Sequence, residues 1–354
     1  MSRLIDLIAR AGARTIAVVG IAKNVGKTTT LNHIIEEAQA EGYSLGLTSI
    51  GRDGEKVDTV TRLPKPPVRV PAGALLATAL EAIRESRAPL EVIGETPYET
   101  RLGRVLLARA VEAGEVVLVG PSTISQMREC LRLLHDQGCS RVLADGAFDR
   151  VASAAPGVTE ATILATGAAL GPSMRLTLER TRQVVRTFRL PAVADPGLRE
   201  MILTASARRE VAVVDGEGNY RALEIRTGLE QAEAISRALP RGGRGIIFGG
   251  ALTGRMLDGL MAAGEHLAGL DLMVADPTRV FIDGEHWTQM ARLGLGLKVA
   301  RDINLLAVTT NPWAPVGPSY QPEEFLEAVG ELLYPLPVFD VVLGRQALGR
   351  RGSV

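Results

Sequence analysis

The chain has 354 residues, of which 46% are hydrophobic and 23% charged, and its 40 basic residues balance its 40 acidic residues. This composition predicts a globular protein of two or three domains and excludes an intrinsically disordered chain. The zero net charge gives no argument for a nucleic-acid or acidic-membrane partner, and the 4% aromatic content argues against base-stacking platforms.

The first residues and the cysteines predict a cytoplasmic protein. Residues 1–14 carry Asp6 and early arginines without a long apolar core, so no signal peptide is expected. No apolar run reaches the roughly 18 residues of a membrane helix, so we expect no membrane insertion. Cys130 and Cys139 are too far apart for a CxxC pair and are interpreted as small buried thiols.

Short apolar runs alternate with longer helical segments in the first half of the chain. Strands are predicted at 15–20, 45–50, 90–94, 115–120, 141–146 and 161–166. Helices are predicted at 28–42, 74–85, 101–113, 122–137 and 173–189. Apolar strands separated by helices predict an α/β fold in which a mostly parallel sheet is flanked by helices. The carboxyl ends of its strands meet at one edge, where ligands bind.

A domain boundary is predicted near Pro191, because residues 190–197 contain two prolines and a glycine. Beyond it, strand-like runs recur at 211–214, 245–249, 270–275 and 305–310. We therefore expect an N-terminal domain over residues 1–190 and a second, smaller α/β domain over residues 191–354.

The segment GIAKNVGKTTT, residues 20–30, lies between a predicted buried strand and an amphipathic helix, which is the context of a phosphate-binding loop. Backbone N–H groups of such a loop and of the helix N-terminus point at an anion. Gly26 lets the backbone approach the phosphates, and Lys27 supplies a positive charge at the β- and γ-phosphates. The Thr28 hydroxyl completes a Mg²⁺ shell, and Thr29 contacts the α-phosphate.

The spacing of this motif departs from the usual GxxxxGK[ST] pattern. Five residues, not four, separate Gly20 from Gly26, and counting from Ile21 restores the spacing but loses the first glycine. The predicted binding residues of the loop are Gly20, Lys23, Asn24, Val25, Gly26, Lys27, Thr28 and Thr29. No guanine-reading NKxD motif is evident, so ATP is the expected nucleotide.

Acidic residues follow two other predicted strands and are candidates for metal and water binding. Asp145 ends the apolar strand 141–146, as a Walker B aspartate does, and is expected to bind Mg²⁺ together with Thr28. Asp53 follows the strand 45–50 and is expected beside the metal or the attacking water. Asp149, in the loop after Asp145, is a candidate for catalysis, with a helix N-cap as its alternative role.

Five segments together resemble one family: GIAKNVGKTTTLNHIIEEA, TSIGRDGE, VLVGPSTISQM, LADGAFDR and AVTTNPWAP followed by PVFDVV. They resemble the P-loop reactivase subunit associated with adenosylcobalamin-dependent lysine 5,6-aminomutase and ornithine aminomutase. The resemblance implies an ATP-dependent accessory protein that works with a MutS-like ATPase subunit to restore an aminomutase that has lost its cofactor. It implies a nucleotide site at Gly20, Asn24, Gly26, Lys27, Thr28 and Thr29, with Asp53 and Asp145 around the metal.

The long loop also resembles that of dethiobiotin synthetase and the cobyrinate amidases, in the P-loop class that includes MinD-like ATPases. MinD-like proteins have an extra lysine, five residues before the second one, that reaches the nucleotide of a dimer partner. Lys23 stands four residues before Lys27, which leaves both this role and a homodimer open. Two alternatives to a partner-directed ATPase also stay open: a small-molecule ligase or kinase, and a nucleotide-binding scaffold without useful hydrolysis.

Overall fold

The structure is a computed structural model that describes residues 3–49, 67–146, 156–223, 235, 238, 243–262 and 267–347. It divides into two compact units. The first unit comprises Met1–Arg182 and Asn304–Val354, and the second comprises Gln183–Ile303. This division differs from the predicted domains 1–190 and 191–354, because the chain leaves the second unit near residue 304 and returns to the first.

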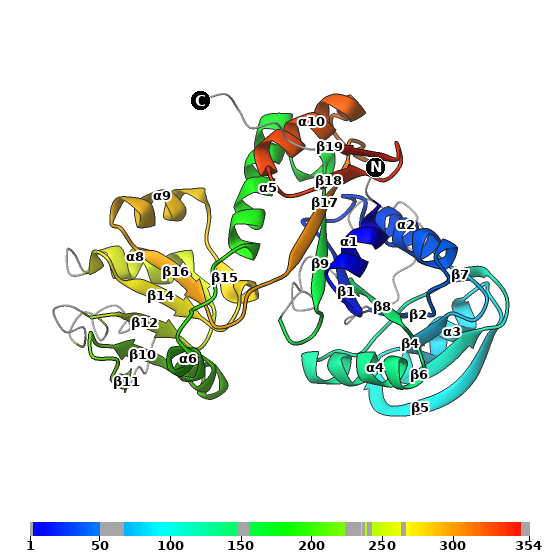
Figure 1. Cartoon of the computed structure of the whole chain (residues 1–354), viewed down its shortest axis with the longest axis horizontal. Coiled ribbons are helices and arrows are strands. Elements are labelled where there is room, and N and C mark those ends of the chain that lie inside the picture. The colour runs from blue at the N-terminus through cyan, green and yellow to red at the C-terminus, as the bar shows by residue number, and fades with distance from the viewer. Residues whose placement is uncertain are drawn as a thin grey trace. The chain divides into compact units, whose positions relative to one another are not determined.

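A mixed sheet forms the centre of the first unit, with ten strands in the described ranges and the order β19-β18-β17-β9-β1-β8-β2-β4-β6-β5. Its strands are β1 (Thr15–Gly20), β2 (Leu45–Ser49), β4 (Leu75–Ala79), β5 (Leu90–Thr100), β6 (Gly103–Ala110), β8 (Arg141–Gly146), β9 (Ala161–Gly167), β17 (Leu305–Asn311), β18 (Val338–Asp340) and β19 (Arg345–Ala347). The seven strands from β18 to β4 are parallel. β19 pairs antiparallel with β18, and β6 pairs antiparallel with both β4 and β5. Figure 1 allows the strands to be followed from β5 to β1. The predicted α/β fold with a mostly parallel sheet is confirmed.

The remaining elements of the first unit are a small antiparallel strand pair and the helices. They are β3 (Val68–Val70), β7 (Gly114–Val116), α1 (Leu4–Arg10), α2 (Lys27–Ala40), α3 (Leu80–Glu85), α4 (Ile124–Asp136), the 3₁₀ turn η2 (Ala168–Leu170), α5 (Met174–Phe188) and α10 (Pro322–Leu333). α5 continues past Arg182 into the second unit.

Helices α2 and α4 lie on opposite faces of the sheet, because successive side chains of a strand point to opposite faces and pack against different helices. Leu47 of β2 and Leu143 of β8 belong to one core cluster with Leu31 and Ile34 of α2. The intervening residues of the same strands, such as Val142, pack with the apolar face of α4. Because each helix runs antiparallel to the strand it joins, both helices begin at the carboxyl edge of the sheet.

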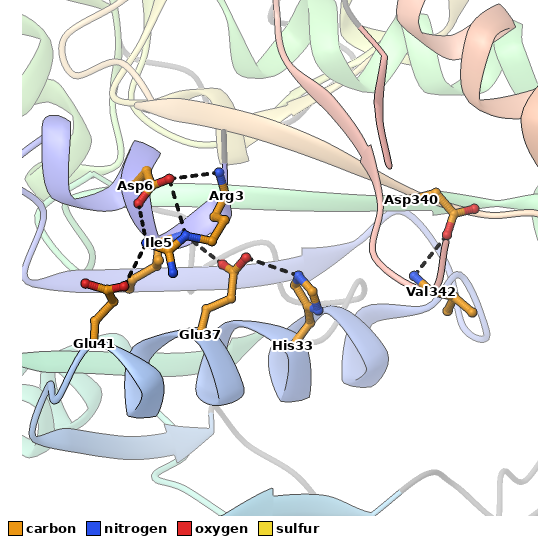
Figure 2. A network of polar contacts seen from close by, with 8 residues as sticks. All are labelled: Arg3, Ile5, Asp6, His33, Glu37, Glu41, Asp340 and Val342. Carbon is orange, nitrogen blue, oxygen red and sulfur yellow. Dashed lines mark hydrogen bonds and ion pairs between the residues drawn. The ribbon is translucent and has the colours of Figure 1, made fainter. Parts of the chain in front are cut away.

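Helix α1 is tied to α2 by a polar network, which Figure 2 shows. The Ile5 N–H donates to Glu37 Oε2 at 2.9 Å, and Glu37 Oε1 lies 3.3 Å from His33 Nε2. Arg3 contacts Asp6 at 3.0 Å and Glu41 at 2.7 Å. These contacts anchor the N-terminal segment on the helix that follows the predicted phosphate loop.

The second unit is a smaller α/β unit, and its described residues include a five-stranded sheet in the order β11-β10-β12-β14-β16. Helix α6 packs on one face of this sheet, and α8 and α9 pack on the other. Its elements are α6 (Pro196–Arg208), β10 (Val211–Val214), β11 (Tyr220–Leu223), β12 (Gly245–Phe248), β13 (Leu252–Thr253), α8 (Gly254–Ala262), β14 (Asp271–Val274), η4 (Pro277–Arg279), β15 (Val280–Phe281), α9 (Gly284–Arg292) and β16 (Gly296–Val299). Within the described ranges, no helix of the chain has the length and apolar character needed to cross a membrane.

Three predicted elements were wrong. Residues 101–113 were expected to be a helix, but β6 occupies Gly103–Ala110 and pairs with both β4 and β5. Residues 74–85 were expected to be one helix, but the strand β4 precedes the short helix α3. The predicted strand at 115–120 is limited to β7 at its start.

Candidate functional site

Residues 21–26 connect β1 to α2 at the carboxyl edge of the first unit's sheet, and β9 and β17 hold this loop at two points. The Ile21 N–H donates to the carbonyl oxygen of Ala165 in β9 at 2.9 Å. Asn311, the last residue of β17, donates from Nδ2 to the carbonyl oxygen of Asn24 at 3.0 Å. The loop is therefore fixed in position by strands that are distant in sequence.

Gly26 is the N-cap of α2 and has a φ of +89°, a left-handed conformation that favours glycine. A Cβ atom at this position would lie 2.9 Å from the Cβ of Asn311. The Thr30 N–H donates to the Gly26 carbonyl at 2.9 Å, which starts the helical ladder. The N–H groups of residues 27–29 therefore have no acceptor within the helix, and no side chain caps this end. Such a helix N-terminus attracts an anion.

Lys27 and Asp145 form the charged centre of the site. The Nζ of Lys27 lies 2.6 Å from Oδ1 of Asp145, and their side chains are 22% and 17% exposed. Asp145 stands on β8, the parallel neighbour of β1, at the same edge as the loop. The two residues were predicted separately, from motifs that are more than a hundred positions apart, and the fold brings their charges into contact.

Within the described ranges, two buried oxygens at this edge lack a hydrogen-bond partner. They are Oδ1 of Asp145, whose contact with Lys27 is an ion pair without hydrogen-bond geometry, and Oγ of Ser49 at the end of β2. Ser49 and Asp145 are paired in the register of β2 with β8. Thr28 lies half-buried in the first turn of α2. Hydroxyl and carboxylate oxygens beside a phosphate-binding loop are the donor set that Mg²⁺ prefers, so these residues fit the predicted metal.

The structure places the other predicted loop residues in different roles. Val25 is 1% exposed and packs under Gly20, where a Cβ atom would lie 2.9 Å from Val25 Cγ2. Asn24 is exposed, has a φ of +62° and contributes its carbonyl oxygen to the bond with Asn311. Lys23 is also exposed, and Thr29 lies half-buried beside Thr28. The predicted acidic residues Asp53 and Asp149 lie outside the described residues.

Two residues of this site, Asn311 and Ser49, were not among the predicted site residues. Each stands at or next to the end of an apolar run that was predicted as a strand, 305–310 for Asn311 and 45–50 for Ser49. A position at or just after the end of a predicted apolar strand is therefore the sequence signal that could have identified both residues. What the sequence does not reveal is that β17 lies beside β9 in the same sheet, with β9 and β1 between it and β8.

In the described part of the chain, no group of three or more His, Cys, Asp or Glu side chains is arranged to hold a metal ion. A site with one protein carboxylate still suits Mg²⁺, which usually keeps several waters and takes other oxygens from phosphates. Comparisons with protein-family models, with curated proteins and with solved structures found no match. The functional argument therefore depends on the geometry of this site.

Proposed function

We propose that this chain is a P-loop NTPase that binds ATP with Mg²⁺ at the carboxyl edge of the first unit's sheet and hydrolyses it. The observation that carries the proposal is the pairing of Lys27 with Asp145, at 2.6 Å, beside a helix N-terminus without a side-chain cap. A surface turn has no need of a partly buried lysine at the start of a helix paired with an aspartate near the end of a neighbouring strand. A phosphate site needs both charges.

The backbone of the loop supports the binding of phosphates. The N–H groups of residues 27–29, which have no acceptor within the helix, and the positive end of the α2 dipole attract the negative oxygens. Gly26 brings the backbone close because it carries no side chain, and Asn311 holds the loop in this shape from β17. Lys27 is close enough to exchange its contact with Asp145 for a contact with a β- or γ-phosphate oxygen.

Thr28 and Asp145 are the residues that would hold Mg²⁺, which supplies charge neutralisation at the β- and γ-phosphate oxygens when bound. The Thr28 hydroxyl lies in the first helical turn, and the Asp145 carboxylate ends the neighbouring strand. Asp53 and Asp149 are the predicted residues for orienting the attacking water, and this role stays a prediction.

The biological role that we propose is partner-directed: ATP-dependent reactivation of a cobalamin-dependent aminomutase, together with a MutS-like ATPase subunit. The support for this role is the sequence resemblance over five segments. Radical enzymes become trapped with damaged cobalamin in a closed site, and opening such a site requires conformational free energy. A nucleotide that binds two states with different affinity shifts their equilibrium by a few kcal/mol, which is enough for this purpose.

The nucleotide site is tested by thermal unfolding of the intact chain with Mg-ATP, with Mg-GTP and without nucleotide. At about 100 times the dissociation constant, binding stabilises the folded state by roughly 2.7 kcal/mol, or roughly 5 to 11 °C for a unit of this size. We expect this shift with ATP and its loss in Lys27→Ala. Lys298→Ala is the matched control, because Lys298 also pairs with an aspartate, Asp271, at 2.7 Å but lies in the second unit.

Hydrolysis and partner action are tested by phosphate release. The proposal predicts turnover that rises when an inactivated aminomutase and the MutS-like subunit are added, together with recovery of aminomutase activity. Turnover that requires a small metabolite would indicate the ligase or kinase alternative. Binding without turnover under any of these conditions would indicate a scaffold.

A further inference from the structure

We propose that Ser49 is a further positioning residue of the magnesium site, where its hydroxyl holds a metal-bound water beside Asp145. This inference rests on the proposed function, because the water in question arrives with Mg²⁺ and the nucleotide. It adds a residue from β2 to a site otherwise built from α2 and β8.

Ser49 lies next to Asp145 in the sheet and on the same face. The register of β2 and β8 pairs Leu47 with Leu143 and Ser49 with Asp145. Both leucines belong to the core cluster that α2 covers, and side chains two positions apart on a strand share a face. Ser49 and Asp145 therefore stand side by side on the face from which Lys27 approaches.

The Ser49 hydroxyl is the anomaly that points to a missing partner. Ser49 is fully buried, yet its Oγ makes no hydrogen bond to any residue that the structure describes. Buried hydroxyls nearby are bonded: Thr48 Oγ1 donates to the Ala77 carbonyl at 2.9 Å, and Thr30 Oγ1 lies 2.7 Å from Thr309 Oγ1. A buried polar group without a partner is costly, so such groups commonly mark an absent water, ion or ligand.

The neighbouring backbone fixes the end of β2 on which Ser49 stands. Gly120 packs directly on this end of β2, and a Cβ atom at Gly120 would lie 1.6 Å from the Ser49 carbonyl oxygen. This backbone contact leaves no room for the strand end to shift toward Gly120. The Ser49 backbone is therefore held in register beside Asp145, and groups held next to a metal ligand in this way orient the ligands and waters of the metal.

Lys27 compensates the charge of one of the two oxygens, Oδ1 of Asp145. Its ammonium lies 2.6 Å from Asp145 Oδ1 and supplies a positive charge there. When Lys27 turns to the phosphates, Asp145 and Ser49 are both left facing a site that needs a cation and its waters. A water held by Mg²⁺ donates one hydrogen to the Ser49 oxygen and so satisfies it.

The test is a Mg²⁺ titration of ATP binding by the full chain, together with ATP binding in EDTA. Ser49→Ala removes the hydroxyl, and Ser49→Cys removes it while nearly preserving the volume. We expect both variants to require about tenfold more Mg²⁺ for half-maximal effect, with ATP binding in EDTA unchanged. Ser44→Ala is the matched control, because Ser44 precedes β2 at its amino end and bonds the Gly138 carbonyl at 2.8 Å.

A second readout uses the protein without nucleotide. Because the Ser49 hydroxyl has no hydrogen-bond partner among the described residues, Ser49→Ala is expected to leave the melting temperature unchanged or raise it, whereas Ser44→Ala lowers it. A clear fall in Ser49→Ala would mean that the hydroxyl is bonded within the protein, which overturns the inference.

The binding results separate failure of this inference from failure of the proposed function. A wild-type response to Mg²⁺ that both Ser49 variants retain unchanged would overturn the role of Ser49 and leave the nucleotide site intact. A wild-type chain that binds no ATP at any Mg²⁺ concentration would overturn both.

Discussion

Asp145→Asn removes the carboxylate that Lys27 contacts, and its effect can be worked out from the ion pair. At 2.6 Å and an effective dielectric constant of about 20, the gross attraction between the two charges is about 6 kcal/mol. The loss of hydration offsets most of this, because both side chains are largely buried. We therefore expect a net contribution on the order of 1–3 kcal/mol to the nucleotide-free protein.

This ion pair makes ATP binding depend on magnesium in a predictable way. Without Mg²⁺, ATP must draw Lys27 away from Asp145, and the freed carboxylate then repels the phosphates. Asp145→Asn removes both costs, so it should bind ATP about tenfold more tightly in EDTA, which corresponds to about 1.4 kcal/mol. With Mg²⁺ present, Asp145→Asn should bind ATP more weakly than wild type, because the variant has lost a metal ligand.

The assay is a fluorescence titration with ATP, in EDTA and in Mg²⁺. Trp313 is a suitable reporter, because it is 59% exposed and its backbone N–H donates to Oδ1 of Asn311, the residue that holds the loop. Asp271→Asn is the control, since it removes a similar carboxylate from a 2.7 Å pair in the second unit. An Asp145→Asn variant that binds ATP more weakly than wild type under both conditions would refute this reasoning.

Two further predictions concern groups outside the site. Burial raises the pKa of the Cys130 thiol to about 12 and that of Cys139 to about 11, so neither should react with a thiol reagent at pH 8 until the protein is unfolded. Rapid labelling of the native protein would contradict this. The hydrogen bond to Glu37 raises the pKa of His33 above its ordinary value of about 6.5. The resulting stabilisation is complete below about pH 6.5 and is lost as the pH rises through the raised pKa. The difference in melting temperature between wild type and His33→Gln should therefore shrink as the pH rises through that range. A difference that stays constant with pH would exclude a stabilising contact between protonated His33 and Glu37.

The apolar strands of the first unit could be predicted from the sequence because they are buried on both faces. Residues 15–20, 45–49 and 161–166 are continuous apolar or small runs bounded by polar or glycine residues, and they form β1, β2 and β9. Such runs are too short for most helices and have no polar face. The same pattern located the loop after β1 and Asp145 near the end of β8.

The edge of the sheet could not be predicted in the same way. Residues 103–110 contain leucine, alanine and arginine, which favour helices, and their spacing also fits an amphipathic helix. They form β6 because β4 and β5 pair with them on both sides, and this pairing depends on tertiary structure rather than on local preference.

The return of the chain to the first unit was also beyond sequence reasoning. Residues 305–310 form an apolar run like those of the second unit, and nothing local assigns them to either sheet. They join the first sheet because β17 pairs with β9, from Leu305 beside Thr162 to Asn311 beside Gly167. That pairing brings Asn311 to the loop, which is why the residue could not be placed in the site from sequence alone.

The most direct test of the central claim is a calorimetric titration of Mg-ATP into the intact chain and into Lys27→Ala. We predict one nucleotide site per chain in the wild type and in Lys298→Ala, and loss of binding in Lys27→Ala. Absence of binding in the wild type, or equal binding by Lys27→Ala, would contradict the assignment of residues 20–29 as a phosphate-binding loop.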